Sequence, residues 1–202
     1  MRKQTRGRGA LELALTVAVA IGLAFCVQAY AVKPYRIPSA SMEPTLHEGD
    51  RVLVNRFSHR LGAEPQVGQV VVFHPPRGAD LTPARCGVPV SARSACPTPT
   101  SAASEQTFIK RVVGVGGDRI AVAGGHVLRN GARESDSYIA PCGGGEACDL
   151  PRTITVPSGY VFLMGDNRGN SDDSRFWGPV PLSWVIGQAV SIYWPPDRVG
   201  TL

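Results

Sequence analysis

The feature that most constrains this chain is an apolar run of twenty residues, Leu13 to Val32, that contains no charged side chain. As an α-helix it would be roughly 30 Å long, which matches the hydrocarbon core of a bilayer. Basic residues precede it at positions 2, 3, 6 and 8. By the positive-inside rule we expect residues 1–12 to be a cytoplasmic tail, 13–32 a single transmembrane anchor in the cell membrane, and 33–202 an extracytoplasmic domain.

A cleavable signal peptide is the alternative for the same run. The segment Ala29-Tyr30-Ala31 resembles a small-x-small processing site, and a basic stretch precedes the apolar run. The apolar region of a signal peptide has about 7 to 15 residues, which is shorter than this run. An uncleaved anchor is therefore expected, and both interpretations place the rest of the chain outside the cytoplasm.

The charge distribution argues against a nucleic-acid surface. The net charge of the 202-residue chain is +5, but the four basic residues before position 10 account for +4 of it, so the remainder is close to neutral. A chain of this length holds one main domain that can bury enough surface to fold without a cofactor.

Four cysteines follow the apolar run, and exported thiols oxidise. Cys86 and Cys96 are separated by nine residues, and Cys142 and Cys148 by five, without the paired C-x2-C knuckles typical of zinc sites. Four cysteines allow three pairings. We expect Cys86–Cys96 and Cys142–Cys148 because each of these closes a short loop, and we expect no metal.

The exported part is expected to be mostly β, with twisted, partly closed antiparallel sheets and a small cap-like excursion. Short β-branched runs bounded by Gly, Pro, Asn or Asp predict strands. They begin at Arg51, Gln69, Phe108, Tyr160 and Trp184. The chain contains 23 Gly and 17 Pro, which leaves little room for long helices. Residues 74–107 are predicted to be an exposed loop and residues 124–151 an irregular excursion.

Familiar catalytic motifs are absent: the sequence contains no G-x-S-x-G, H-E-x-x-H, Walker or Rossmann pattern. His47, the histidine nearest to the serines at 39 and 41, lies in a turn-like Leu-His-Glu-Gly-Asp segment. A catalytic triad would also need an acid to orient this histidine, so we expect it to be solvated.

Lysine gives a sharper signal than histidine. Only three of the 21 basic residues are lysines: Lys3, Lys33 and Lys110. The first two lie on either side of the apolar run. Alternation along Phe108-Ile-Lys-Arg-Val-Val places Lys110 on the face opposite Arg111. A buried lysine can lose its proton and act as a base, whereas arginine cannot. A buried ion pair is the equally weighted structural alternative.

The densest polar cluster extends from Met164 to Gly178 and follows an apolar strand. A calcium loop is disfavoured because Arg168 and Arg175 would lie among the oxygen ligands. Its Asp-Asn turn and closely spaced Asp and Arg residues instead predict a hydrogen-bonded scaffold around a site.

Three of these stretches together resemble bacterial type I signal peptidases, membrane-bound serine endopeptidases that use a Ser-Lys dyad. The resemblance lies in P-S-A-S-M-E-P-T-L (38–46), F-I-K-R-V-V-G-V-G-G-D (108–118) and G-D-N-R-G-N-S-D-D-S-R-F-W-G (165–178). These stretches occur in the expected order behind the apolar run. The segment 74–107 has no counterpart in this pattern, and its role is open.

The resemblance assigns roles to individual residues. Ser41 would be the nucleophile, Lys110 its general base, and Ser39 an oxyanion donor beside the Ser41 N–H. Ser171 would orient the lysine amine, Gly165 would leave room for the lysine stem, and Asn167 would belong to the same turn. Asp166 would pair with Arg111, and Asp173 with Arg175. The pockets for small substrate side chains would be lined by Tyr35, Ile37, Pro38, Met42, Leu46, Phe108 and Ile109.

The resemblance thus implies that the protein removes signal peptides from exported preproteins at small-x-small sites. Its partners would be those preproteins and the lipid bilayer, with no nucleic acid and no cofactor, and we expect a monomer. Two alternatives stay open. One is a membrane-anchored β domain that binds a partner without catalysis, and the other is a self-cleaving Ser-Lys peptidase of the repressor type.

Overall fold

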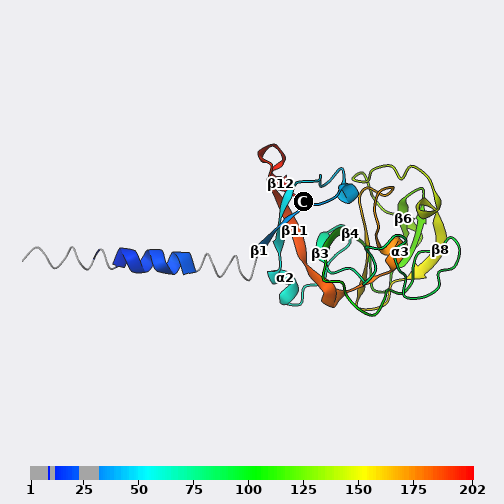
Figure 1. Cartoon of the computed structure of the whole chain (residues 1–202), viewed down its shortest axis with the longest axis horizontal. Helices are drawn as coiled ribbons and strands as arrows, with labels where there is room; N and C mark the ends of the chain where they lie inside the picture. Colours follow the sequence, from blue (N-terminus) through cyan, green and yellow to red (C-terminus); the bar gives the residue numbers. More distant parts are fainter. Residues whose placement is uncertain (1–8, 10–11, 23–31) are drawn as a thin grey trace, which may run out of the picture.

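The computed structural model describes residues 9, 12–22 and 32–202 of the chain. Residues 12–22 are helical (Figure 1). The large apolar side chains among them are between 49% and 66% exposed. Within the described residues, no helix is both long and apolar enough to cross a bilayer. Residues 23–31 of the predicted span, and most of the predicted tail, lie outside the described residues. The last residue of that span, Val32, begins a strand, because it pairs with Asn55.

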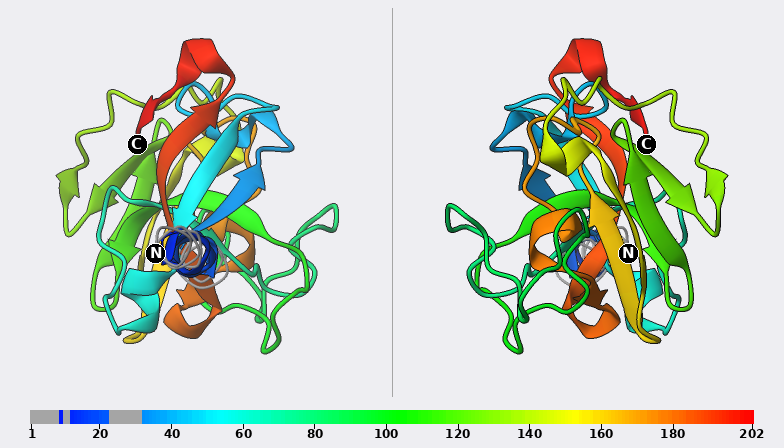
Figure 2. Two further views of the ribbon diagram at one scale, coloured as in Figure 1. Left: turned by 90° about the vertical axis from the view of Figure 1, so that its left-hand side faces the viewer. Right: turned by 90° about the vertical axis from the view of Figure 1, so that its right-hand side faces the viewer.

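A large antiparallel sheet forms most of the fold, as the sequence predicts. Its order is β1-β2-β11-β3-β4-β9-β10, and β12 pairs with β11. Figure 2 shows the twist of the strands from two sides. Register shifts occur where β11 meets β2 and β3 and where β4 meets β9, and such bulges increase the twist of a sheet. The strands are Val32–Arg36 (β1), Arg51–Asn55 (β2), Val70–Phe73 (β3), Phe108–Val115 (β4), Tyr160–Met164 (β9), Val180–Pro181 (β10), Val185–Trp194 (β11) and Gly200–Thr201 (β12).

A second antiparallel sheet has the order β7-β6-β5-β8 and includes parts of the segment predicted to be irregular. Its strands are Arg119–Ala123 (β5), His126–Arg129 (β6), Ala132–Arg133 (β7) and Leu150–Thr155 (β8). The prediction of irregular structure therefore does not hold for residues 126–129, 132–133 and 150–151. Two tight turns explain the difference: Gly124-Gly125 and Asn130-Gly131 all have positive φ and join adjacent strands.

Helices in the described part of the domain are short, as the glycine and proline content predicts. Two α-helices, Phe57–Arg60 (α2) and Ser174–Trp177 (α3), are accompanied by four 3₁₀ helices. The 3₁₀ helices are Ala40–Met42 (η1), Glu146–Cys148 (η2), Leu182–Trp184 (η3) and Pro196–Arg198 (η4). Met42 and Leu46 are fully buried against strands β2 and β3, and Trp177 fills a separate cluster with Phe73.

Both predicted disulfides, Cys86–Cys96 and Cys142–Cys148, are formed. The first one lies in the segment 74–107, which was predicted to be exposed. That prediction is wrong for part of the segment, because Ala79, Ala95 and Cys96 are at most 2% exposed and pack into the domain. The segment lacks regular strands, yet these three residues belong to the buried core.

Candidate active site

The short turn after β1 carries the two serines. Ile37 is anchored by its N–H, which donates to the Asp50 carbonyl at 2.8 Å, and Met42 pulls η1 onto the core. Between these anchors Ser39 is exposed and Ser41 half-buried. The Ser39 hydroxyl donates to Ser41 Oγ at 3.3 Å. The turn therefore holds Ser41 at the surface of the apolar core, between two buried residues.

Lys110 lies in the middle of β4, where Val71 of β3 is its neighbour. It is only 4% exposed, and its Nζ lies 2.6 Å from Ser41 Oγ, the atom to which it donates. The sheet thus brings together two residues that are 69 positions apart. This is the contact that the resemblance requires of a Ser-Lys dyad.

Burial lowers the pKa of the Lys110 amine to about 8, because desolvation disfavours the charged form. The carboxylates of Asp173, Asp172 and Asp166 oppose this shift, and the Arg175 guanidinium adds to it. A neutral amine is therefore accessible in mildly alkaline solution, which a base next to a hydroxyl needs.

The turn that follows β9 is hydrogen-bonded to the segment that carries Ser41. Asn167 donates from its backbone N–H to the Ser41 carbonyl at 3.1 Å and from its side chain to the Ala40 carbonyl at 3.2 Å. Asp166 is fully buried and accepts two hydrogen bonds from Arg111, at 2.6 and 2.8 Å. The structure places Asp166 and Arg111 in an ion pair, on the side of β4 opposite Lys110.

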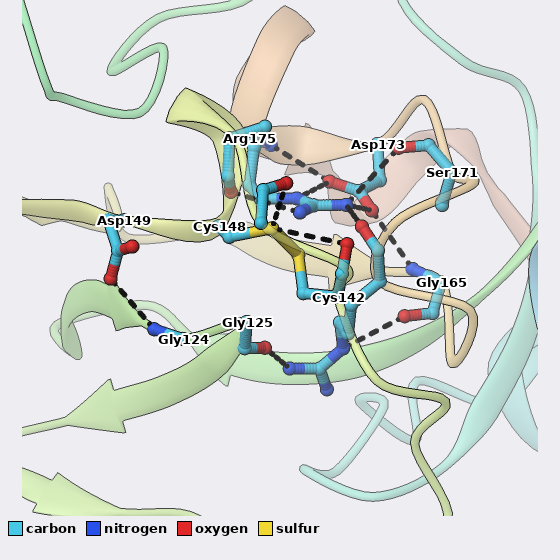
Figure 3. The surroundings of a disulfide bond; sticks show 12 residues. Gly124, Gly125, Cys142, Cys148, Asp149, Gly165, Ser171, Asp173 and Arg175 are labelled. Atoms are coloured by element: carbon cyan, nitrogen blue, oxygen red, sulfur yellow. Dashed lines mark hydrogen bonds and ion pairs between the residues drawn. A yellow bond between two sulfur atoms is a disulfide. The ribbon is translucent and has the colours of Figure 1, made fainter.

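The predicted pair between Asp173 and Arg175 is also present (Figure 3). Asp173 is fully buried and accepts from Arg175 Nε at 2.8 Å and Nη2 at 2.9 Å, and also from the Gly165 N–H at 3.1 Å. Arg175 beside it holds the pKa of the Asp173 carboxyl below its usual range, although burial alone would raise it. The remaining donors of Arg175 bind the carbonyls of Arg168, Ser171 and Ala147.

Two residues of this turn differ from their expected arrangement. Ser171 lies in the cleft, but the described residues give its buried hydroxyl no hydrogen-bond partner, so the expected bond to the Lys110 amine is not formed. Gly165 was expected to make room for the lysine stem. A Cβ at Gly165 would instead first meet the Ser171 side chain and the Ser41 carbonyl. Ser171 can therefore pack against Ser41 only because Gly165 has no side chain.

Ser41 and Lys110 lie in a cleft of about 720 Å³. Five of the predicted pocket residues line it: Tyr35, Ile37, Pro38, Phe108 and Ile109. Met42 and Leu46 do not line the cleft, because both are fully buried in the core beneath it. All four histidines are described, and none of them lines this cleft.

A further part of the cleft wall was not predicted from the sequence. Residues 144–148, held by the Cys142–Cys148 disulfide, form that wall together with residues 168–172. Arg168 supports it from inside, where its guanidinium lies 2.7 Å from Glu134 and its Nε donates to the Gly165 carbonyl at 2.9 Å. The position of Arg168 within the polar cluster was the available signal for this contact.

Comparison with known proteins identifies the family. Residues 10–194 match the family described as signal peptidase, peptidase S26. This chain belongs to that family. A probable signal peptidase I-1 of Synechocystis is 37% identical over 91% of this chain and 82% of its own length. A signal peptidase I of Mycobacterium tuberculosis is 33% identical over 95% of this chain and 74% of its own length.

A crystal structure of a signal peptidase I from Enterococcus faecalis aligns with 62% of this chain and 97% of its own, at 24% identity and a TM-score of 0.44. The matches to the family and to its curated relatives establish the present chain as a type I signal peptidase. The mostly β fold and the peptidase family were both expected from the sequence.

Proposed function

We propose that this signal peptidase is a membrane-anchored serine endopeptidase that removes signal peptides from exported preproteins, with Ser41 as nucleophile and neutral Lys110 as general base. The observation that carries the proposal is the 2.6 Å contact between Lys110 Nζ and Ser41 Oγ inside a cleft. The lowered pKa of the buried amine supports the same assignment.

In the first half of the reaction, the neutral amine accepts the hydroxyl proton as Ser41 Oγ bonds to the peptide carbonyl carbon. The Ser41 N–H and the Ser39 hydroxyl would stabilise the oxyanion, provided that the Ser39 hydroxyl turns away from Ser41 Oγ. The C–N bond then breaks, and the Lys110 ammonium returns the proton to the leaving amine of the mature protein.

In the second half, water attacks the ester between Ser41 and the signal peptide. Lys110 accepts a proton from this water and returns it to Ser41 Oγ when the ester bond breaks. The signal peptide leaves with a new carboxylate. Ser171 lies next to Ser41 with a free buried hydroxyl, which suits a group that orients the amine once a substrate is bound.

The apolar face of the cleft suits small side chains at the first and third positions before the cut. Met42 and Leu46 are fully buried in the core cluster that also includes Ile37 and Ile109 of the cleft. Membrane anchoring is supported by the charge-free run from Leu13 to Val32 and by the exposed apolar helix at 12–22. Ser41 follows this run by nine residues, at most roughly 30 Å of extended chain, so substrates would be cut close to the bilayer.

The test incubates the purified full chain with an exported precursor and sequences the new N-terminus of the product. We expect cleavage after a small-x-small sequence and none with Ser41→Ala or Lys110→Arg, because arginine retains the charge of lysine but cannot act as a base. Both variants should keep the circular dichroism spectrum of the parent. Full activity of a folded Lys110→Arg enzyme would refute the dyad.

The alternative of a non-catalytic binding domain predicts that the same preparation binds precursors without producing a new N-terminus. Separation of Ser41 from Lys110 beyond hydrogen-bond reach would have favoured that alternative. The 2.6 Å contact favours catalysis.

A further inference from the structure

The segment 96–99 contacts α3, the helix that carries Arg175, and Gly178, which directly follows this helix. The Cys96 N–H donates to the Arg175 carbonyl at 2.9 Å. A Cβ on Gly178 would lie 2.9 Å from Pro99 N and 3.1 Å from Cys96 Sγ, so the two backbones are in close contact. Helix α3 is therefore held at Arg175 and at its C-terminal end by a segment that the peptidase motifs do not include.

The segment 96–99 is itself fixed in several ways. Cys96 is fully buried and is bonded to Cys86, which is only partly covered. The Gly87 N–H donates to the Thr98 carbonyl at 2.9 Å, so the two arms of the disulfide loop also share a backbone hydrogen bond. Ala95 packs into the cluster that includes Val113 of β4. These contacts leave the segment little freedom to move away from α3.

Arg175 connects α3 to the cleft. Its guanidinium donates to the carbonyls of Ser171 and Arg168 on one side and to that of Ala147 on the other. Residues 171 and 147 line the cleft that holds Ser41 and Lys110. A shift of the Arg175 backbone would therefore move both parts of that wall.

We propose that Cys96, locked by its disulfide to Cys86, is a positioning residue for the Ser41–Lys110 site, because the segment 96–99 holds α3 and thereby keeps the turn 165–173 closed over Lys110. This inference rests on the proposed function of that site. It assigns a role to the segment 74–107, which the sequence left open.

Closure matters because Lys110 depends on the exclusion of water. The charged groups that act on its amine come from the turn and from α3: Asp166, Asp172, Asp173 and Arg175. Strand β3 contributes only Val and Phe, while Arg36 and Glu146 line the same cleft. Desolvation is the largest influence on this amine, so water that enters under a loosened turn would favour its charged form.

The test compares the full-length parent with Cys86→Ser/Cys96→Ser in detergent, by measuring kcat/KM for one precursor from pH 6 to 10. We expect the midpoint of the rising limb to move up by about one pH unit, which lowers kcat/KM at pH 7 by about tenfold. At pH 10 the two rates should nearly coincide. The matched control is Val88→Ser/Val90→Ser, in the same disulfide loop, whose side chains are 38% and 44% exposed; its profile should match the parent's.

Gly178→Ala provides a second variant with both disulfides intact. Gly178 has a φ of +89°, so alanine there strains the backbone and pushes α3 away from Pro99. The same upward shift is expected, and this variant decides the question if the cysteine variant does not fold. An unchanged midpoint in the folded variants, even with a lower melting temperature, would overturn the positioning role. A parent that shows no Ser41-dependent cleavage would instead refute the proposed function.

Discussion

Replacing Asp173 by Asn should destabilise the domain far more than the loss of a surface ion pair. Asp173 is fully buried and Arg175 is 3% exposed, so the variant leaves a guanidinium charge inside the protein without its counter-ion. Arginine cannot discharge itself by losing a proton. Its other hydrogen bonds, to three backbone carbonyls, keep it in place rather than releasing it to solvent.

The expected cost follows from this burial. Removing one member of a buried ion pair costs about 3 to 5 kcal/mol, because the partner's desolvation is no longer compensated. For a domain of this size, 1 kcal/mol corresponds to roughly 2 to 4 °C in melting temperature. Asp173→Asn should therefore lower the melting temperature by about 6 to 20 °C.

The assay is thermal unfolding of the full chain in detergent, followed by near-ultraviolet circular dichroism at pH 7. Arg129→Ala is the matched control: its pair with Asp118 measures 3.7 Å, and the Arg129 side chain is 41% exposed. Such a pair contributes at most about 1 kcal/mol. If Asp173→Asn loses no more than this control, the buried pair is not a major source of stability.

The pH dependence of stability provides a second check on the same pair. The pKa of Asp173 is lowered in the folded state, so its contribution is fully present at neutral pH. It is lost as the pH falls through the folded-state value. The difference between the parent and Asp173→Asn should therefore be constant around pH 7 and should shrink on acidification below about pH 4.

Two further predictions concern activity. Precursor cleavage by the parent should rise with pH around a midpoint of about 8, since in the proposed dyad only neutral Lys110 can accept the Ser41 proton. The measurement is a series of kcat/KM values from pH 5 to 10, and a flat profile would contradict this role. Gly165→Ala should reduce cleavage at least a hundredfold at pH 9 while the fold is kept, because the new methyl group displaces Ser171 and the Ser41 carbonyl. Wild-type activity in a folded Gly165→Ala enzyme would show that this contact can relax.

The strands of the main sheet were predictable because burial on one or both faces leaves a clear pattern. The runs that begin at Arg51, Phe108 and Tyr160 form β2, β4 and β9 with the expected starts. Strand β1 was missed, since Val32 continues the apolar run and Pro34 disfavours a strand. The hydrogen bonds to β2 hold this segment as a strand, although its own sequence has no strand pattern.

The second sheet was missed for a different reason. Its strands are short and carry charged residues, as in β7, which consists of Ala132 and Arg133 alone. The Gly124-Gly125 and Asn130-Gly131 turns were readable signals of hairpins, and counting them would have corrected the prediction.

The two ion pairs of the site, Asp166–Arg111 and Asp173–Arg175, were predictable because both partners of each pair lie in the motifs that carry the family resemblance. The wall formed by residues 144–148 was not. It depends on how the Cys142–Cys148 loop lies over Gly169, where a Cβ would meet the Cys142 carbonyl. The burial of residues 95–96 likewise depends on contacts with α3 that no local pattern encodes.

The order of the main sheet bears on when this peptidase becomes active. Ser41 follows β1 and Lys110 lies on β4, and β2, β11 and β3 separate these two strands. Four strand spacings in a flat sheet would amount to roughly 19 Å, so only the completed, curled sheet can bring the two side chains together. Strand β11 (Val185–Trp194) follows β1, β2, β3 and β4 in the chain and pairs with both β2 and β3, so it joins the two halves of the sheet. Before β11 has paired with β2 and β3, Ser41 and Lys110 are therefore apart, and the proposed dyad is not yet assembled.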